Sequence, residues 1–309
     1  MSPNAIFLYE IDESFGPNII AEYYLSNIKL SQEILKEFIE KHVEKELVDA
    51  TVKKNDIRYY SSKIDAKSIG KDNLYLGFIL LENEDLISLK SIFEKSEEKI
   101  IENFSDNRRS MTNLLKDHLS SILSLLEKLK EPKLIIETIN EKTKKMLDNG
   151  NLKEARELIE LGEKIPLKLA QEIQLADKYF RENDFKKAKK SFEKAAELAA
   201  LIQEDEIVAF LQNKGEKVGT FPDLLKEREA YLKEVKRAFT ELTVSAQLKK
   251  SYEVVLPAIE RVAYISNLVE DDNLLKLFNE LMEDTKEAYK LATKLYDLNE
   301  NLKNLGSKI

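Results

Sequence analysis

The first 105 residues alternate between dense apolar runs and segments with a helical period. AIFLYEI and IIAEYYL, separated by DESFGPN, predict two strands joined in a hairpin at Gly16 and Pro17. ATVKKNDIRYYSSKI and NLYLGFILLEN predict two or three further strands, and we expect helices over SQEILKEFIEKHVEKEL, which Ser31 can cap, and over LISLKSIFEKSEEKIIENF. AIFLYEI and NLYLGFILLEN lack polar alternation, so both strands should lie in the interior of one antiparallel sheet covered by helices.

This order of strand, strand, helix, two or three strands and helix, together with AIFLYEIDESFGPNIIAEYYL, resembles the longin domain family. The resemblance covers residues 1–105 and implies a role in membrane-trafficking machinery. Longin domains bind small GTPases, fold back on helical partners or dimerise. The chain departs from the longin SNARE proteins because no membrane anchor follows. A profilin-like or another small α+β sheet is the alternative.

The rest of the chain has a helical period. Residues 110–131 place their large apolar side chains on one stripe and Pro132 ends it, which predicts a connecting helix. Further along, NKGEKVGTFPD contains Gly215, Gly219 and Pro222 and predicts the clearest loop of the helical half.

Two stretches of this helical half echo each other at a spacing of 33 residues, MLDNGNLKEARELIELGEKIP and YFRENDFKKAKKSFEKAAELA. Such a period is typical of stacked helix pairs. Residues 171–200 resemble the tetratricopeptide repeat family, whereas the first unit matches less well because Thr143 and Gly162 stand at two small positions. Two repeats are few for a solenoid, so flanking helices must cap them. The expected repeat-packing residues are Leu175, Ala176, Tyr179, Ala188, Phe192 and Ala195.

Helices are also expected after the loop. One or two should run from Leu224 to Val254 and end before Pro257, and PAIERVAYISNLV predicts another. Asp271, Asp272 and Asn273 are candidate N-caps for a long last helix. This helix has a leucine heptad seam, which is typical of coiled coils. Packing within the chain and pairing with a partner helix both fit this seam. Its positions are Leu274, Leu277, Leu281, Asp284, Ala288, Leu291, Leu295, Leu298, Leu302 and Leu305.

The predicted fold class is therefore an α+β N-terminal domain with an antiparallel sheet, followed by an all-α C-terminal region. The α+β domain should span residues 1–105 and the connecting helix 106–132. The TPR-like helical repeats should span 133–214, and 215–309 should form a C-terminal helical region with the heptad-seamed last helix.

Composition narrows the functional classes. The net charge is -8 with acids and bases interspersed, so the basic face expected of a nucleic-acid-binding protein is missing. Without cysteine the chain has no disulfides, thiolate metal sites or cysteine nucleophiles. No apolar run has transmembrane length and the first residues do not resemble a signal peptide, so we expect a cytoplasmic protein. Peripheral membrane association stays open.

The sequence contains no recognisable catalytic pattern. His42 and His118 stand outside any HExxH arrangement, and Gly215 and Gly219 are not followed by the Lys-Ser or Lys-Thr of a phosphate-binding loop. We therefore predict a non-enzymatic protein without a cofactor or a metal.

Candidate partner-binding residues lie in four places. Phe15 is at the apolar hairpin tip, Tyr59 and Tyr60 point to opposite sheet faces so that one ring could be exposed, and Arg108 and Arg109 flank the interdomain junction. The run KKAKK could bind an acidic tail or anionic lipid, although such a run is more often the solvated outer face of a repeat helix. Its candidates are Lys186, Lys187 and Lys190.

The function expected from these patterns is an adaptor or scaffold for protein–protein interaction, with a small GTPase of trafficking-type machinery as a candidate partner. The alternative is a helical assembly subunit that forms homo- or hetero-oligomers through its N-terminal domain or its last helix.

Overall fold

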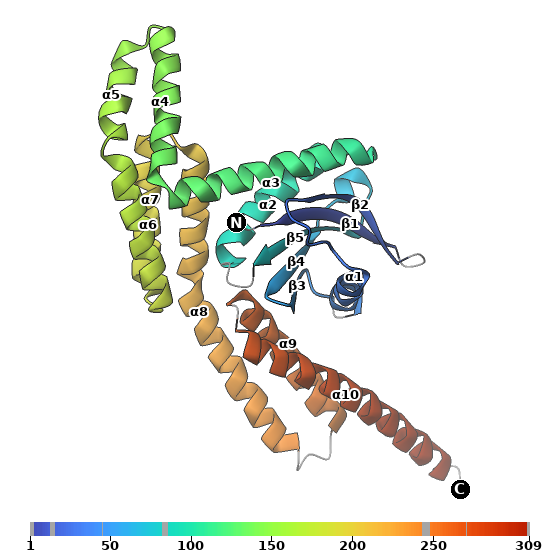
Figure 1. Cartoon of the computed structure of the whole chain (residues 1–309). Coiled ribbons are helices and arrows are strands. Elements are labelled where there is room, and N and C mark those ends of the chain that lie inside the picture. The colour runs from blue at the N-terminus through green and yellow to red at the C-terminus, as the bar shows by residue number, and fades with distance from the viewer. Residues whose placement is uncertain are drawn as a thin grey trace. The chain divides into compact units, whose positions relative to one another are not determined.

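The computed structural model describes residues 3–12, 16–44, 46–81, 86–242, 248–269 and 271–307 (Figure 1). The chain divides into two compact units, Met1–Gly215 and Glu216–Ile309. The first unit contains a five-stranded antiparallel sheet and the helices that follow it, which confirms the predicted fold class of an α+β region followed by an all-α region. No helix in the described part of the chain has the length and hydrophobicity needed to cross a bilayer.

The sheet has the order β2-β1-β5-β4-β3. The β1 and β2 strands form the predicted hairpin, and the dense runs β1 and β5 both lie inside the sheet, as expected. The alternation of side chains along β1 sends Phe7 and Tyr9 to one face and Ile6 and Leu8 to the other, and all four are buried. The strands are β1 (Ala5–Asp12), β2 (Gly16–Tyr24), β3 (Asp49–Lys54), β4 (Ile57–Ile64) and β5 (Leu74–Leu81).

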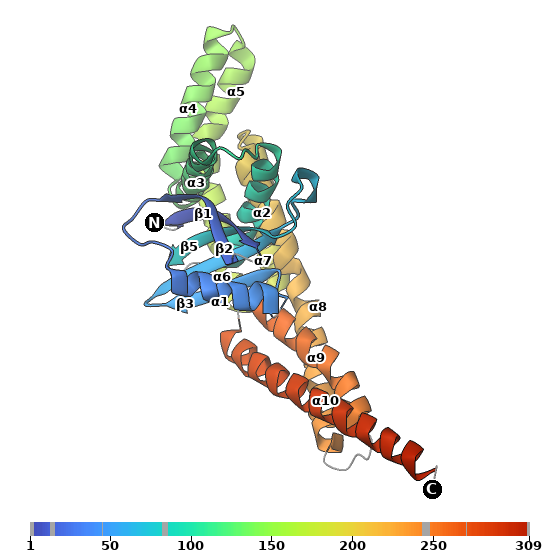
Figure 2. The ribbon, with the colours of Figure 1, turned by 90° about the vertical axis from the view of Figure 1, so that its right-hand side faces the viewer.

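Helices cover both faces of the sheet (Figure 2). On one face lies α1 (Gln32–Ile39), whose N-terminus Ser31 caps by accepting a hydrogen bond from the Ile34 N–H. A π-helical turn (Glu40–Glu44) continues it, and a 3-10 turn (Lys67–Ile69) precedes β5. The other face is covered by α2 (Leu86–Glu102) and α3 (Arg108–Lys130).

The helix α3 does more than connect successive elements. It leads from the sheet to α4, and it also packs on β1 and β2, where it buries Met111, Leu115 and Leu119 completely. The apolar stripe that predicted the helix is therefore the stripe that closes the second face of the sheet.

Two helical hairpins follow, α4 (Pro132–Asp148) with α5 (Leu152–Gly162), and α6 (Ile165–Arg181) with α7 (Phe185–Leu201). Their turns repeat the same backbone geometry. Gly150 and Asn183 have positive φ angles of 82° and 60°, and the N–H of the next residue, Asn151 or Asp184, donates to the carbonyl five residues earlier at 2.9 Å. Because this is a Schellman-type helix end, the 33-residue echo in the sequence corresponds to a repeated interhelical turn.

The prediction of a loop at NKGEKVGTFPD is wrong, because these residues lie within α8 (Asp205–Leu242). A Cβ on Gly215 would come within 3.2 Å of Phe192 Cβ, so close packing explains this glycine without a turn. Pro222 lacks the N–H of a helix interior, which costs about 3 kcal/mol. Burial of Val218 and Phe221 beside it helps to offset that cost.

The helix end expected before Pro257 is also wrong. The proline lies inside α9 (Leu248–Leu268), where a buried face runs past it through Val255, Ala258 and Ile259. The last helix, α10 (Asp272–Gly306), is capped by Asp271, the first of the three candidates, which accepts a hydrogen bond from the Leu274 N–H at 3.2 Å. It packs along α9 in the second unit.

Candidate interaction surfaces

A pocket of about 220 Å³ opens between α2, α3 and the first turns of α8, all in the first unit. Its wall is made by the buried apolar side chains Ile92, Ile122, Leu125 and Phe210. Pockets that hold whole small molecules usually measure about 300–1,000 Å³. This one is therefore the size for a single apolar side chain. We call it the α2–α3–α8 pocket.

The rim of the α2–α3–α8 pocket is positively charged. Lys95 and Lys99 stand one turn apart on α2 and are exposed, and Glu206 is the acid at the rim. Neither lysine has an ion-pair partner among the residues that the structure describes. Burial and the nearby charge of Lys99 lower the pKa of His118, which keeps that imidazole neutral at pH 7. Two lysines thus face one carboxylate.

A buried ion cluster positions the α8 wall of the pocket. The carboxylate of Glu204, just before α8, is only 4% exposed and pairs with Lys128 of α3 at 3.1 Å and Lys142 of α4 at 2.6 Å. Lys142 also donates to the Gln203 carbonyl oxygen at 2.6 Å. These contacts hold the start of α8 against α3 and α4, and so place Glu206 and Phe210 at the pocket.

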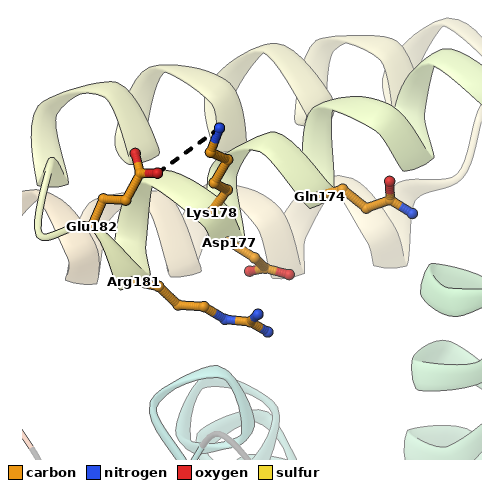
Figure 3. Close-up of a pocket in the computed structure, with 5 residues that line it drawn as sticks. All are labelled: Gln174, Asp177, Lys178, Arg181 and Glu182. Atoms are coloured by element: carbon orange, nitrogen blue, oxygen red, sulfur yellow. Dashed lines mark ion pairs between the residues drawn. The ribbon is translucent and has the colours of Figure 1, made fainter.

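A second, shallower hollow of about 430 Å³ lies along α6 and differs in charge. Figure 3 shows Lys178 reaching along the helix to Glu182, with Asp177 and Arg181 projecting from the other side. The Lys178–Glu182 distance is 3.9 Å, and Asp177 pairs with Lys214 at 2.9 Å. Because opposite charges balance here, this hollow has little basis for selecting a charged ligand.

The second unit exposes a row of leucines on α10. These side chains are 51–65% exposed, whereas Phe278, Met282, Thr285 and Ala292 of the same helix are buried. The predicted heptad seam is thus largely not the face that packs within the chain. We call the exposed residues the α10 leucine row: Leu291, Leu295, Leu298, Leu302 and Leu305.

A hydrogen-bonded chain of His42, Ser61 and Tyr9 lies inside the sheet domain. His42 Nδ1 is 2.6 Å from the Leu47 carbonyl, His42 Nε2 is 3.0 Å from Ser61 Oγ, and Ser61 Oγ is 2.7 Å from the Tyr9 hydroxyl. Burial lowers the pKa of His42 to about 4 and raises the pKa of Tyr9 well above its usual value. Ser61 is fully buried, so no substrate reaches this serine and histidine, and the group serves the core.

Several predicted partner-binding residues occupy other environments. Tyr59 and Tyr60 do face opposite sides of the sheet, but they are 6% and 3% exposed, so the expectation of an exposed ring is wrong. Tyr60 stacks on Phe93 of α2, and its hydroxyl donates to Asp49 at 2.8 Å. Helices cover both faces of β4 and leave neither ring accessible. Phe15 lies outside the described residues.

The predicted basic residues all lie on the surface. Arg108 approaches Glu22 of β2 at 3.5 Å instead of an acid of the repeats, and Arg109 is exposed at the start of α3. Lys186, Lys187 and Lys190 are exposed on α7, and Lys187 pairs with Asp184 at 2.7 Å. They lie outside both hollows and are not brought together with Arg108 and Arg109 in either.

Most of the expected repeat-packing residues do pack. Ala176, Ala188, Phe192 and Ala195 are fully buried and Tyr179 is partly buried. Leu175 is 36% exposed, which corrects its predicted role. It lies one residue before the buried Ala176, so the helix turns it away from the α6–α7 contact.

The pocket residues were missed by sequence reasoning. Lys95 and Lys99 are separated by four residues on a predicted helix, which places them on one face. No pattern in the sequence links that face to Phe210, more than 100 residues away. Comparison with protein-family models, curated proteins and solved structures finds no match for this chain, so the geometry of these surfaces carries the functional argument.

Proposed function

We propose that this protein is a non-enzymatic cytoplasmic adaptor that binds a partner protein through the α2–α3–α8 pocket. The observation that carries the proposal is the combination of a pocket sized for one side chain with a rim where two lysines face a single carboxylate. An apolar anchor loses water on entering such a pocket, and this is the usual source of affinity at interaction hot spots.

The chemistry of the rim indicates the kind of segment that binds. A peptide with one phenylalanine or leucine between acidic residues fills the apolar wall and brings carboxylates to Lys95 and Lys99. The neutral imidazole of His118 loses less hydration than an imidazolium would when an apolar group covers it. Exposed ion pairs are each worth only about 0.2–1 kcal/mol, so the anchor supplies most of the affinity and the lysines supply the selectivity.

The proposal is tested with a fluorescein-labelled peptide that has one phenylalanine between two Asp-Glu pairs, measured by fluorescence anisotropy. We expect saturable binding that weakens as salt is added. Replacing the phenylalanine by serine, or both Asp-Glu pairs by Asn-Gln, should reduce the affinity about tenfold or more, the equivalent of about 1.4 kcal/mol.

The matching protein variants separate the pocket from general surface charge. Lys95→Glu with Lys99→Glu should weaken binding about tenfold or more. Lys116→Glu with Lys130→Glu changes two exposed lysines of α3 that do not line the pocket, and it should leave binding unchanged. Equal losses of affinity in the two double variants would show that peptide binding depends only on the net charge of the protein. That result would contradict binding at the α2–α3–α8 pocket.

The order of elements in the sheet domain favours a second candidate, a longin-like domain that binds a small GTPase. The order β1, β2, α1, β3, β4, β5, α2 supports it. Because α3 buries one face of the sheet, residues 1–131 and not 1–105 are the segment to assay. Affinity purification from native lysate should enrich a small GTPase on the full chain and on residues 1–131, but not on residues 132–309. Equal recovery on both removes this candidate.

A further inference from the structure

The α10 leucine row continues beyond the helix that α10 packs against. Within the second unit, Lys249, at the start of α9, lies over the Tyr296 ring with Nζ 5.1 Å from its centroid. The three leucines after Tyr296 therefore lie beyond the N-terminus of α9. They are Leu298, Leu302 and Leu305. Both views show α10 extending beyond α9 (Figures 1 and 2). All three side chains are more than half exposed, so neither α9 nor the part of α8 in this unit covers them.

The spacing within the row is that of a coiled coil. From Leu291 to Leu305 the steps are four, three, four and three residues. This places Leu295 and Leu302 at heptad position a and the other three at position d, where side chains insert between those of a facing helix. If this face of α10 were exposed only to solvent, we would expect polar residues at these positions.

The residues that flank the row fit a second copy of the same helix. Ala292, Asn299 and Gly306 occupy the e positions, and Lys294 and Asn301 occupy the g positions. In a parallel pair each g residue faces the following e residue of the other helix, so Lys294 meets Asn299 and Asn301 meets Gly306. Neither pairing brings like charges together.

The same flanks argue against a specific different helix. Selective pairing between unlike helices is usually set by opposite charges at e and g, and here Lys294 is the single charge among them. The charged residues of this stretch lie at outer positions, where Lys303 pairs with Glu300 of its own helix at 2.7 Å. The α10 leucine row can thus pair with a second copy of itself without repulsion between charges. Its flanks lack the charged e and g residues that would select a different helix.

From this geometry we infer that two copies of the chain associate through a parallel, in-register coiled coil over residues 291–305. The contact spans about two heptads, so the dimer is weak and depends on protein concentration. Dimerisation makes the proposed adaptor bivalent, because each dimer presents two α2–α3–α8 pockets to a partner that carries repeated acidic and apolar segments.

Sedimentation equilibrium of the full chain, from about 1 to about 200 µM, tests the association. We expect the average mass to rise from 35.7 kDa toward twice that value. Leu298→Glu with Leu302→Glu should remain monomeric throughout. Leu167→Glu with Leu201→Glu, two leucines that are similarly exposed in the first unit, should behave like the wild type. A wild-type chain that stays monomeric, or equal association of all three proteins, overturns the inference.

Cysteine cross-linking tests the orientation. The natural chain has no cysteine, so any disulfide that forms must join two copies of the introduced thiol. A parallel, in-register pair brings the two copies of Leu305→Cys together, and we expect a disulfide-linked dimer under mild oxidation. Asn304→Cys, at an outer position, should cross-link at least tenfold more slowly. Equal rates, or efficient linkage only between Leu291→Cys and Leu305→Cys chains, contradict the parallel arrangement.

These outcomes are independent of the proposed function. The Leu298→Glu, Leu302→Glu variant changes no residue of the α2–α3–α8 pocket, so it should bind the acidic phenylalanine peptide as the wild type does. Loss of peptide binding with intact dimerisation removes the pocket proposal alone, and the reverse result removes the coiled coil alone.

Discussion

The sheet core and the α10 leucine row contain the same kind of residue in opposite environments. Along β5, the run LYLGFILL is buried from Leu74 to Leu80, whereas the leucines of α10 are 51–65% exposed. The strand lies between β1 and β4 and under helices on both faces. The helix packs on α9 and shares an apolar cluster with residues of α8, and its leucine row lies outside that cluster. An apolar residue is thus buried when another element covers it, and its own type does not decide the outcome.

The largest expected contrast comes from truncating one apolar side chain in each region. Phe93 of α2 is buried and stacks on Phe78 with ring centroids 3.6 Å apart. Phe93→Ala should lower the free energy of unfolding of the sheet domain by about 3–5 kcal/mol, because it removes contacts and leaves a cavity. Urea denaturation followed by near-ultraviolet circular dichroism measures it. A loss below about 1 kcal/mol would mean that the second face of the sheet is not a packed core.

The next contrast is in the response to pH, because the sheet core holds a buried titratable group. The pKa of His42 is about 4 in the folded protein, against about 6.5 when exposed. The unfolded chain therefore takes up the proton first as pH falls. Stability contributed by neutral His42 is complete above pH 6.5 and is lost between pH 6.5 and 4, by about 3 kcal/mol.

Urea midpoints at several pH values from 7 to 4 measure this loss. His42→Gln should flatten the decline in that window, whereas His118→Gln, which changes the other histidine, should keep most of it. Identical slopes in the wild type and in His42→Gln would show that carboxylates alone cause the acid sensitivity.

A smaller effect is expected from adding one methyl group to the core. Gly77 of β5 lies under the Phe7 ring, and a Cβ there would come within 2.2 Å of it. Gly77→Ala should lower the free energy of unfolding by about 1–3 kcal/mol, since Phe7 is enclosed and must leave its rotamer or shift the strand. Gly306→Ala on α10 is the matched control, because its Cβ would meet no atom within 4 Å. Similar losses at both positions would contradict this account.

The smallest effect is expected in the α10 leucine row. Leu298→Ala should change the free energy of unfolding by less than about 0.5 kcal/mol when measured at a concentration where the chain is monomeric, because the side chain has little packing to lose. Thermal unfolding followed by circular dichroism measures it. A loss as large as that of Phe93→Ala would mean that the row is covered within the chain.

The outcome at particular residues shows why some predictions succeed. Ser31 was expected to cap a helix and Asp271 was one of three candidate caps. Both are N-caps, because an N-cap needs only the backbone amides two or three residues ahead. The interior positions of β1 and β5 followed from their missing polar alternation. The predictions at Gly215 and Pro257 failed, since packing against other segments kept both residues inside helices.

The sequence by itself determined the local features of this protein: the periods of its strands and helices, the hairpin at Gly16, the repeated turn at Gly150 and Asn183, and the heptad spacing of the leucines. Each depends on hydrogen bonds and side-chain directions within a few residues. The tertiary structure alone decided that α3 closes the sheet and that Lys95 and Phe210 line one pocket. It also decided that the leucine row stays exposed, because burial depends on which distant segment comes to lie alongside.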